Sequence, residues 1–277
     1  MPFTMPIKSA RSVGEKLREA GRLELKPLCV YSPSEMPDGV VQVSDLIRQG
    51  GRCLAKAVML VAAGESDAVG VSRNSKGVCV GALCFMGYAP ISKPMMVDIA
   101  VRGEDAVYIK GTEAVCDSTI DSIGRIESPG DHIVVGTCDF AGDIEPLSYL
   151  CFGTAEQIRN LCGLIHFSAG SAFGQIDAPW GSGCSLFITY PAGMAAGSPK
   201  GVSFLGPTAA DCNPWFPSET MSLSLPAAIA ERMAADVDAS FVAKCPEIAY
   251  PSERDRSVMN AIAKLHPKLE YPGITRS

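Results

Sequence analysis

Apolar residues in this chain gather in short blocks that glycine, proline and polar clusters separate. Blocks of strand length alternate with blocks in which apolar residues recur at helical spacing. The blocks that predict strands are residues 28–31, 67–72, 131–136, 146–152 and 201–205, and those that predict helices are residues 8–22, 51–64, 103–114, 119–126, 155–167 and 227–244. We therefore expect an α/β or α+β fold in which helices flank a mixed β-sheet.

The pattern predicts one domain with short additions at its ends. The 277 residues can bury a sizeable core. No internal repeat, low-complexity segment or Pro/Ser-rich linker divides them. We expect an N-terminal helical extension over residues 1–24, a single α/β domain over residues 25–250, and a C-terminal helix and tail over residues 251–277.

Charge and hydropathy exclude several classes of function. The formal net charge is −6 and lysine and arginine form no cluster, which disfavours a nucleic-acid partner. No run of about 18 apolar residues and no apolar signal core occur, so we expect no membrane segment and a cytoplasmic location. A phosphate-binding loop, a dinucleotide-binding glycine motif and a Gly-x-Ser-x-Gly nucleophile elbow are also absent.

Eleven cysteines are the most informative residues of the chain. Their number is odd, their spacing is wide, and no Cys-x-x-Cys pair occurs. A chain without a secretion signal is expected to keep its thiols reduced, so a disulfide scaffold is a poor explanation. Three histidines leave little room for a His-rich metal site. Any bound metal must therefore be held by thiolates from distant segments, which is a soft site.

The stretch over residues 174–184 carries the clearest candidate thiol. Cys184 follows Gly181 and Gly183, and glycines let the backbone approach a bound group closely. A strand-like run over residues 186–190 follows and could pair with residues 201–205. A cysteine at the mouth of a strand can ligate a metal or act as a nucleophile. The alternative is a glycine-rich turn before a strand, with a cysteine that is merely buried.

Two more thiols have comparable surroundings. Cys53 lies in the first turn of the helix predicted over residues 51–64, where the positive end of the helix dipole lowers a thiol pKa. Cys79 lies between two glycines. Both could instead pack as small core residues. Cys212 lies in a loop rich in proline and aromatic residues.

Gln157, Trp180 and Trp215 are the candidates for a substrate pocket. Gln157 completes a capping box at the start of the helix predicted over residues 155–167. An apolar strand leads into that helix, and ligands often bind at such strand ends. Each tryptophan lies near a candidate cysteine, and aromatic rings can wall a pocket or simply anchor a loop to the core.

Thiolates from three separate segments suit a particular class of site. Cys53, Cys79 and Cys184 could hold a [4Fe-4S] cluster with one iron left open, or a zinc ion with one open position. An open position allows a substrate to bind the metal directly. The placement of the three residues carries this hypothesis, because the chain has no metal-binding spacing motif.

The order of these motifs resembles one protein family, the domain-of-unknown-function 169 family of archaeal and anaerobe-rich bacterial proteins. The resemblance covers residues 25–240 approximately. The motifs that carry it are Arg52-Cys53-x-x-x-Ala57 leading to Gly64-Glu65, Cys79-x-Gly81 with Gly87, the strand and helix joined by Thr154-Ala-Glu-Gln157, and Gly-Ser-Gly-Cys184. The resemblance implies that the three candidate cysteines recur and form a shared site, which Cys212 matches less closely. A distribution among anaerobes agrees with an oxygen-sensitive cluster.

The leading hypothesis is a cysteine-ligated metalloenzyme, with a [4Fe-4S] cluster, that acts on a small organic molecule by reduction or elimination. It implies a small-molecule substrate, a possible electron donor and a possible homo-oligomer. Zinc is the alternative metal. Two other classes stay open: a metal-free small-molecule binding protein or assembly subunit with core cysteines, and an enzyme with a cysteine nucleophile.

Overall fold

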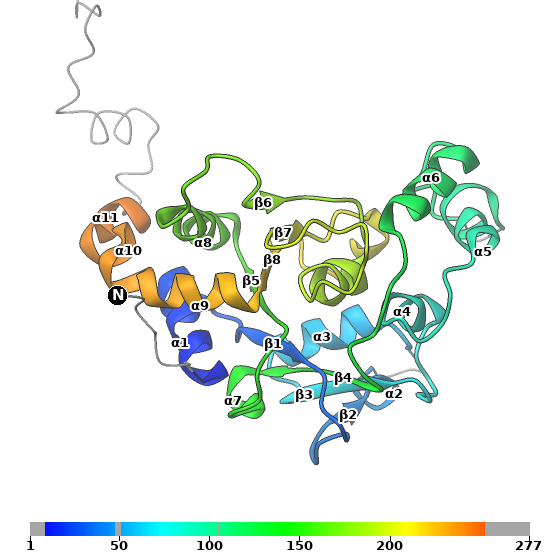
Figure 1. The fold of residues 1–277 in the computed structure, drawn as a ribbon, viewed down its shortest axis with the longest axis horizontal. Helices are drawn as coiled ribbons and strands as arrows, with labels where there is room; N and C mark the ends of the chain where they lie inside the picture. The colour runs from blue at the N-terminus through cyan, green and yellow to red at the C-terminus, as the bar shows by residue number, and fades with distance from the viewer. Residues whose placement is uncertain (1–8, 48–50, 105, 253–277) are drawn as a thin grey trace, which may run out of the picture.

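A single mixed β-sheet forms the centre of the fold (Figure 1). The computed structural model describes residues 9–47, 51–104 and 106–252. In these residues the strands pair in the order β2-β3-β4-β1-β5-β8-β7-β6. They are β1 (Leu28–Tyr31), β2 (Val41–Gln42), β3 (Ala68–Ser72), β4 (His132–Thr137), β5 (Ser148–Gly153), β6 (Ile176–Asp177), β7 (Ser203–Gly206) and β8 (Met221–Pro226).

The inner strands run antiparallel and the two outermost pairs are parallel. Strand β1 pairs with β4 on one side and with β5 on the other, both antiparallel. The short edge strands β2 and β6 are parallel to β3 and β7. The predicted mixed sheet flanked by helices is therefore confirmed, and it belongs to a single α/β domain.

One face of the sheet is covered by helices from both ends of the chain. These are α1 (Ala10–Gly21), α7 (Cys138–Ala141), α8 (Ala155–Phe167) and α9 (Ala227–Asp236), followed by η5 (Val237–Ala239), α10 (Phe241–Lys244) and α11 (Pro246–Ala249). Val13 and Leu17 of α1 are fully buried in this layer. The helix expected as an N-terminal extension is thus part of the core, because its apolar side faces α7, α8 and α9.

The opposite face is covered by α2 (Val43–Leu46), α3 (Leu54–Ala62), α4 (Val80–Phe85) and the π-helix η3 (Ser185–Thr189). Successive residues of a strand point to opposite faces. On β5, Leu150 and Phe152 therefore pack under α3 and η3, whereas Tyr149 and Cys151 pack under α1 and α8. Both layers are apolar, which explains why the strands appear in the sequence as continuous apolar runs.

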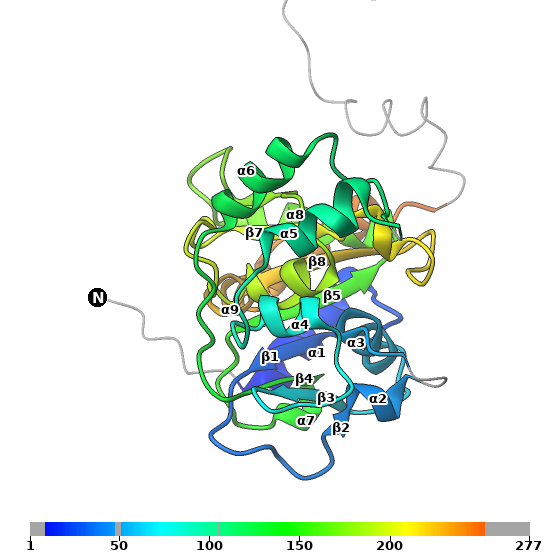
Figure 2. The ribbon, with the colours of Figure 1, turned by 90° about the vertical axis from the view of Figure 1, so that its right-hand side faces the viewer.

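A third group of helices stands apart from the sheet. It contains α5 (Lys93–Val97), the π-helix η2 (Asp98–Arg102) and α6 (Glu113–Ile123), which enclose a small apolar cluster around Ala100, Cys116 and Ile120. In Figure 1 it lies at the other end of the molecule from α8, α10 and α11. Figure 2 faces this end and shows α4 next to α5.

The structure corrects three local expectations. The run predicted as a strand over residues 186–190 is the π-helix η3, and β7 pairs with β6 and β8 instead. Every residue of η3 is buried, and a short apolar run gives no periodicity to separate helix from strand. The helix expected over residues 103–114 begins only at Glu113, because residues 106–109 are irregular backbone. The helix predicted over residues 227–244 is broken into α9, η5 and α10.

Two expectations concern the ends of the chain and the membrane. Most of the predicted C-terminal helix and tail, residues 253–277, lies outside the described residues. Across residues 9–47, 51–104 and 106–252, no helix has the length and apolar character needed to cross a membrane.

Candidate functional site

The structure brings the thiols of Cys53, Cys79 and Cys184 into one neighbourhood. Burial is the largest cause of the raised pKa of the Cys184 thiol, and the neighbouring thiols of Cys79 and Cys53 raise this pKa further. The Cys79 thiol likewise raises the pKa of Cys53. Charges act on one another in this way only over short distances. Segments separated by 25 and by 104 residues of chain thus meet at one place.

Each of these cysteines stands at the start of a helix. Cys53 is the N-cap of α3 and Cys79 is the N-cap of α4, where its sulfur accepts a hydrogen bond from the backbone N–H of Ala82 at 3.4 Å. Cys184 directly precedes η3. The backbone N–H of Cys79 donates to the carbonyl of Arg52 at 2.9 Å, which fixes the start of α4 beside the start of α3.

Backbone N–H groups point at the sulfurs, although burial dominates their pKa values. Hydrogen bonds from the N–H groups of Lys56 and Ala55 lower the pKa of Cys53, and the same Ala55 N–H lowers that of Cys184. In both cases burial outweighs them and the net shift is upward. The helix start therefore acts on Cys53 in the expected direction, but the net pKa is raised, because removing a thiolate from water costs more than these donors recover.

Gly183 allows the close approach of η3 to α3. A Cβ atom at this position would lie 2.4 Å from the Cβ of Ala55 and 2.9 Å from Cε2 of Phe187. Only glycine lets the two backbones meet here without displacing one of them. The glycine before Cys184 thus has a structural reason that the sequence showed only as a pattern.

Cys212 joins the same group as a fourth thiol. It ends the 3₁₀-helix η4 (Ala210–Cys212) and is 2% exposed. Burial first, then the Asp211 carboxylate, raises the pKa of this thiol to about 12, and the Cys53 thiol also contributes. The backbone N–H of Gly183 acts in the opposite direction. A loop that the sequence linked only loosely to the site therefore lies against it.

Hydrogen bonds tie the loop before Cys184 to the loop before Cys212. The N–H of Ala209 donates to the carbonyl of Gly181 at 3.1 Å. The N–H of Gly181 in turn donates to the Thr208 hydroxyl at 3.0 Å, and that hydroxyl donates to the carbonyl of Pro179. The two loops consequently hold their cysteines as a unit.

The donor set is chemically suited to a soft metal or an iron–sulfur cluster. Thiolates are the ligands that such groups prefer, and backbone N–H groups directed at sulfur tune their potentials. As the side chains stand, the described residues contain no group of three or more His, Cys, Asp or Glu side chains that could hold a metal ion. The thiols are thus neighbours, but they are not arranged around a single ion.

Aromatic rings close the site on the side of the sheet. Phe187 of η3 meets Phe152 of β5 edge to face, with ring centroids 5.1 Å apart. Phe216 lies 5.9 Å from Phe152, and Trp215 packs on Phe216 at 5.9 Å. Trp215, predicted as a pocket residue, is a half-buried member of the apolar layer that also contains Cys53, Cys79 and Cys184.

Gln157 lies elsewhere. Its Oε1 accepts from the backbone N–H of Thr154 at 2.9 Å, and its Nε2 donates to the carbonyl of Arg22 at 2.6 Å. The capping box predicted from the sequence is therefore formed. Because α8 covers the other face of the sheet, Gln157 stabilises a helix start away from the thiols.

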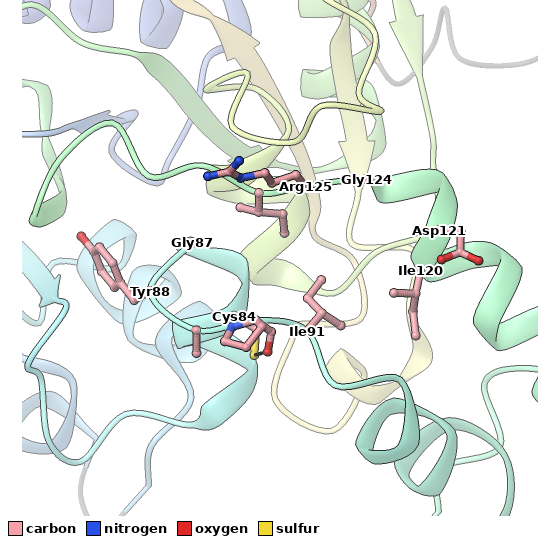
Figure 3. A pocket seen from close by; sticks show the side chains of 11 residues that line it. Cys84, Gly87, Tyr88, Ile91, Ile120, Asp121, Gly124 and Arg125 are labelled. Carbon is pink, nitrogen blue, oxygen red and sulfur yellow. Dashed lines mark hydrogen bonds between the residues drawn. The ribbon is translucent and has the colours of Figure 1, made fainter.

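A pocket of about 480 Å³ lies at the end of α4 opposite Cys79 (Figure 3). Cys84 and Ile91 lie close together in it, Ile120 of α6 faces them, and the Arg125 guanidinium points away. The Cys84 thiol donates to the carbonyl of Pro90 at 3.2 Å, and burial raises its pKa. The lining thus combines apolar side chains with the polar side chains of Tyr88, Asp121 and Arg125.

A smaller pocket lies beside Trp180, the third predicted pocket residue. Its volume is about 250 Å³, and α6, β7 and the loop before Cys184 line it. The Lys110 ammonium stands over the Trp180 ring, 4.2 Å from the centroid. Sequence reasoning missed Lys110, because nothing in the residues around it distinguishes it from other lysines.

Another thiol group lies across the sheet. The Cys138 thiol has its pKa raised by a hydrogen bond with Cys29, by burial and by the Cys151 thiol. All three residues are buried under α1. Cys29 on β1 and Cys151 on β5 lie on adjacent strands, and Cys138 begins α7 directly after β4, which pairs with the other side of β1. The sequence alone did not reveal this group.

Comparison with known proteins agrees with the resemblance seen in the sequence. No curated protein and no solved structure matches the chain. The family described as DUF169, "Uncharacterised ArCR, COG2043", matches residues 16–236. The match spans every strand of the sheet and all four thiols of the site; it begins within α1 and ends with α9. This chain therefore belongs to the DUF169 family.

Proposed function

We propose that this protein is a cysteine-ligated metalloenzyme in which Cys53, Cys79 and Cys184 bind a [4Fe-4S] cluster with one open iron. The observation that carries the proposal is the meeting of these three thiols at the starts of α3, α4 and η3. A cubane cluster spreads its ligands over several irons, so its thiolates need not converge on one ion. Zinc held by the same thiolates is the alternative.

The residues of the chain would prepare the site for such a cluster. The N–H groups of Ala55, Lys56 and Ala82 would donate to its sulfur ligands. The rings of Phe152, Phe187 and Phe216 would keep water from its sheet side. When bound, a cluster with an open iron supplies a Lewis acid and an electron carrier in one group, which suits reduction or elimination on a small organic molecule.

Cys212 has one of two roles in this proposal. It lies near Cys53 and Cys184, so it could complete the ligand set. It could also leave the fourth iron to a substrate and serve only as a neighbour. Reduction would further require an electron donor, and the eleven free cysteines agree with a reducing compartment such as the cytoplasm.

The burial of the thiols favours ligation over nucleophilic catalysis. The charges that act on Cys53, Cys184 and Cys212 are other thiols and Asp211, and all of them raise the thiol pKa. A catalytic cysteine needs a neighbouring cation or base to become a thiolate near neutral pH. A metal instead supplies the compensating charge itself.

The test is the iron and acid-labile sulfide content of protein purified and reconstituted without oxygen. Wild type should contain about four of each per chain, with a broad visible band that bleaches on reduction. Single Cys→Ser variants at Cys53, Cys79 and Cys184 should each lose most of the iron. The control is Cys245→Ser, which replaces the half-buried N-cap residue of α11 and should keep the iron.

The Cys212→Ser variant decides the number of ligands. If Cys212→Ser keeps the iron content of wild type and its spectrum changes when small ligands are added, the cluster has three cysteine ligands. If the variant loses iron, Cys212 is the fourth ligand. Thermal unfolding of every variant shows whether it is folded. The proposal fails if wild type holds neither iron and sulfide nor zinc after reconstitution, or if all three single variants keep wild-type metal content.

A further inference from the structure

A third pocket, of about 580 Å³, lies where β7 ends and β8 begins. The two strands are antiparallel neighbours, yet residues 207–220 are needed to join them. Antiparallel neighbours require only about 2–5 connecting residues, and much longer connections are often functional. This connection carries Cys212 and also forms one wall of the pocket. It therefore does more than link two strands.

Apolar atoms contribute most of the surface of this pocket. They belong to Leu205 at the end of β7, to Met221 at the start of β8, and to Pro207, Phe216 and Pro217 of the connection. The volume lies within the range of about 300–1,000 Å³ that is usual for small-molecule sites. The pocket therefore suits the apolar body of a small organic molecule.

Three polar side chains of the connection also line the pocket, and a ligand can reach them. Asn213 and Ser218 are exposed and Thr220 is half-buried. Within the part of the chain that the structure describes, none of these side chains forms a hydrogen bond. An amide and a hydroxyl can each donate and accept. They can therefore bind a polar group of a ligand without giving up a partner in the protein.

The lining contains no charged side chain. Asp177 precedes one lining residue in the chain, and Glu219 lies between two others, but neither lines the pocket itself. An anion would lie near these carboxylates and would find no cation in the lining. A cation would lose water against the apolar surface and would find no opposite charge there. An uncharged molecule consequently fits the pocket best.

The pocket shares the Phe216 ring with the thiol site. This ring lies 5.9 Å from the Phe152 ring and 6.2 Å from the Phe187 ring, measured between centroids. The backbone N–H of Phe216 donates to the carbonyl of Cys212 at 3.0 Å, and Asn213 follows Cys212 in the chain. A ligand in the pocket would thus contact the residues on both sides of the Cys212 turn.

We propose that this pocket binds a small uncharged organic molecule. Its apolar body lies against Leu205, Phe216 and Met221, and a hydrogen-bonding group of the ligand meets Asn213 and Thr220. This site is separate from the proposed metal centre, and none of its residues is a metal ligand. Binding therefore does not depend on whether the thiols hold a cluster.

Calorimetric titration with a matched set of probes tests the charge and class of the ligand. Cyclohexylmethanol and cyclohexanecarboxamide are the uncharged probes. Cyclohexanecarboxylate and cyclohexylmethylammonium have a similar shape and carry one charge of each sign. We expect saturable binding of at least one uncharged probe with a Kd of about 1 mM or tighter, and roughly tenfold weaker binding of both charged analogues.

Variants of the polar wall test where the probe binds. Asn213→Leu has a similar size without the amide, and Thr220→Val has nearly the same shape without the hydroxyl. Each should weaken binding of the uncharged probe roughly tenfold. Asn74→Leu, which replaces an exposed asparagine in the turn after β3, is the matched control and should not change it. Thr220→Val keeps the test valid if Asn213→Leu does not fold.

A change of specificity gives a stricter test. Asn213→Asp places a carboxylate in the wall, so it should strengthen binding of cyclohexylmethylammonium roughly tenfold relative to wild type. The assignment is overturned if neither uncharged probe binds, if a charged analogue binds wild type as tightly as the uncharged probes, or if both Asn213→Leu and Thr220→Val keep wild-type affinity.

The pocket and the metal can fail separately. Binding of an uncharged probe by protein that holds no metal supports the pocket even where the cysteine variants refute the cluster. Conversely, wild-type protein that contains iron and sulfide but binds neither uncharged probe overturns the pocket and leaves the cluster proposal standing.

Discussion

The hydroxyl of Thr189 donates a hydrogen bond to the backbone carbonyl of Phe85 at 2.7 Å. Phe85 ends α4, which Cys79 begins, and Thr189 ends η3, which Cys184 precedes. The two residues are 104 positions apart in the chain and Thr189 is fully buried. This bond fixes the position of one thiol-bearing helix relative to the other.

Replacing Thr189 should show how much that bond contributes. Thr189→Val has nearly the same shape but leaves the Phe85 carbonyl buried and unpaired, so we expect a loss of about 1–3 kcal/mol in the free energy of unfolding. Thr189→Ser keeps the hydroxyl and loses one methyl group, at a cost of about 0.8 kcal/mol. Denaturant unfolding measures both. Equal losses in the two variants would show that the methyl, not the hydrogen bond, matters.

The glycine before Cys184 gives a second prediction. Gly183→Ala forces a Cβ into Ala55 and Phe187, and overpacking of this kind costs about 1–3 kcal/mol of stability. Since it would also push η3 from α3, we expect it to lower the iron content after reconstitution. Thermal unfolding and iron analysis on the same sample measure the two effects.

Gly81 provides the matched control for that variant. It lies in α4, two residues after Cys79, and a Cβ there meets nothing within 4 Å. Gly81→Ala should therefore stabilise the protein by about 0.5–1 kcal/mol through helix propensity and leave iron content unchanged. A stability loss in Gly81→Ala comparable to that in Gly183→Ala would contradict the packing explanation.

The capping box of α8 separates stability from function. Thr154→Ala removes the N-cap oxygen and should cost about 0.5–2 kcal/mol. Gln157→Ala should cost a similar amount, and the double variant less than the sum, because the two side chains form one reciprocal motif. Iron content should stay at the wild-type level in all three. A loss of iron in Gln157→Ala without a matching loss in Thr154→Ala would contradict this separation.

Alkaline pH should destabilise the protein through its buried thiols. Burial raises the pKa of Cys151 to about 12, above the ordinary value of 9.0. The unfolded chain therefore releases a proton between these two values that the folded chain retains. Stability conferred by the neutral thiol is present in full below pH 9 and is lost as the pH rises towards 12, at about 1.4 kcal/mol per pH unit.

Urea unfolding at a series of pH values from about 8 to about 11 measures this slope. Cys151→Ala should make it shallower by about one thiol's contribution, after allowance for the lost packing. An unchanged slope in Cys151→Ala would show that other groups govern the alkaline limit.

Local chemistry accounts for the elements that the sequence predicted well. The capping box at Thr154 and Gln157 and the apolar runs that became β1, β4 and β5 rest on residues close together in the chain. The run that became η3 was mistaken for a strand because its neighbours in space, not its own residues, make it helical.

The sequence by itself determined the mixed sheet, its covering helices, the family and the three cysteines worth attention. Only the tertiary structure decided that Cys53, Cys79 and Cys184 are neighbours, that Cys212 joins them, and that Gln157 does not. The physical reason is that propensity, capping and hydrophobic pattern act over a few residues. Thiol proximity, the fit of Gly183 against Ala55 and the net pKa shifts arise from packing between segments that the chain order leaves far apart.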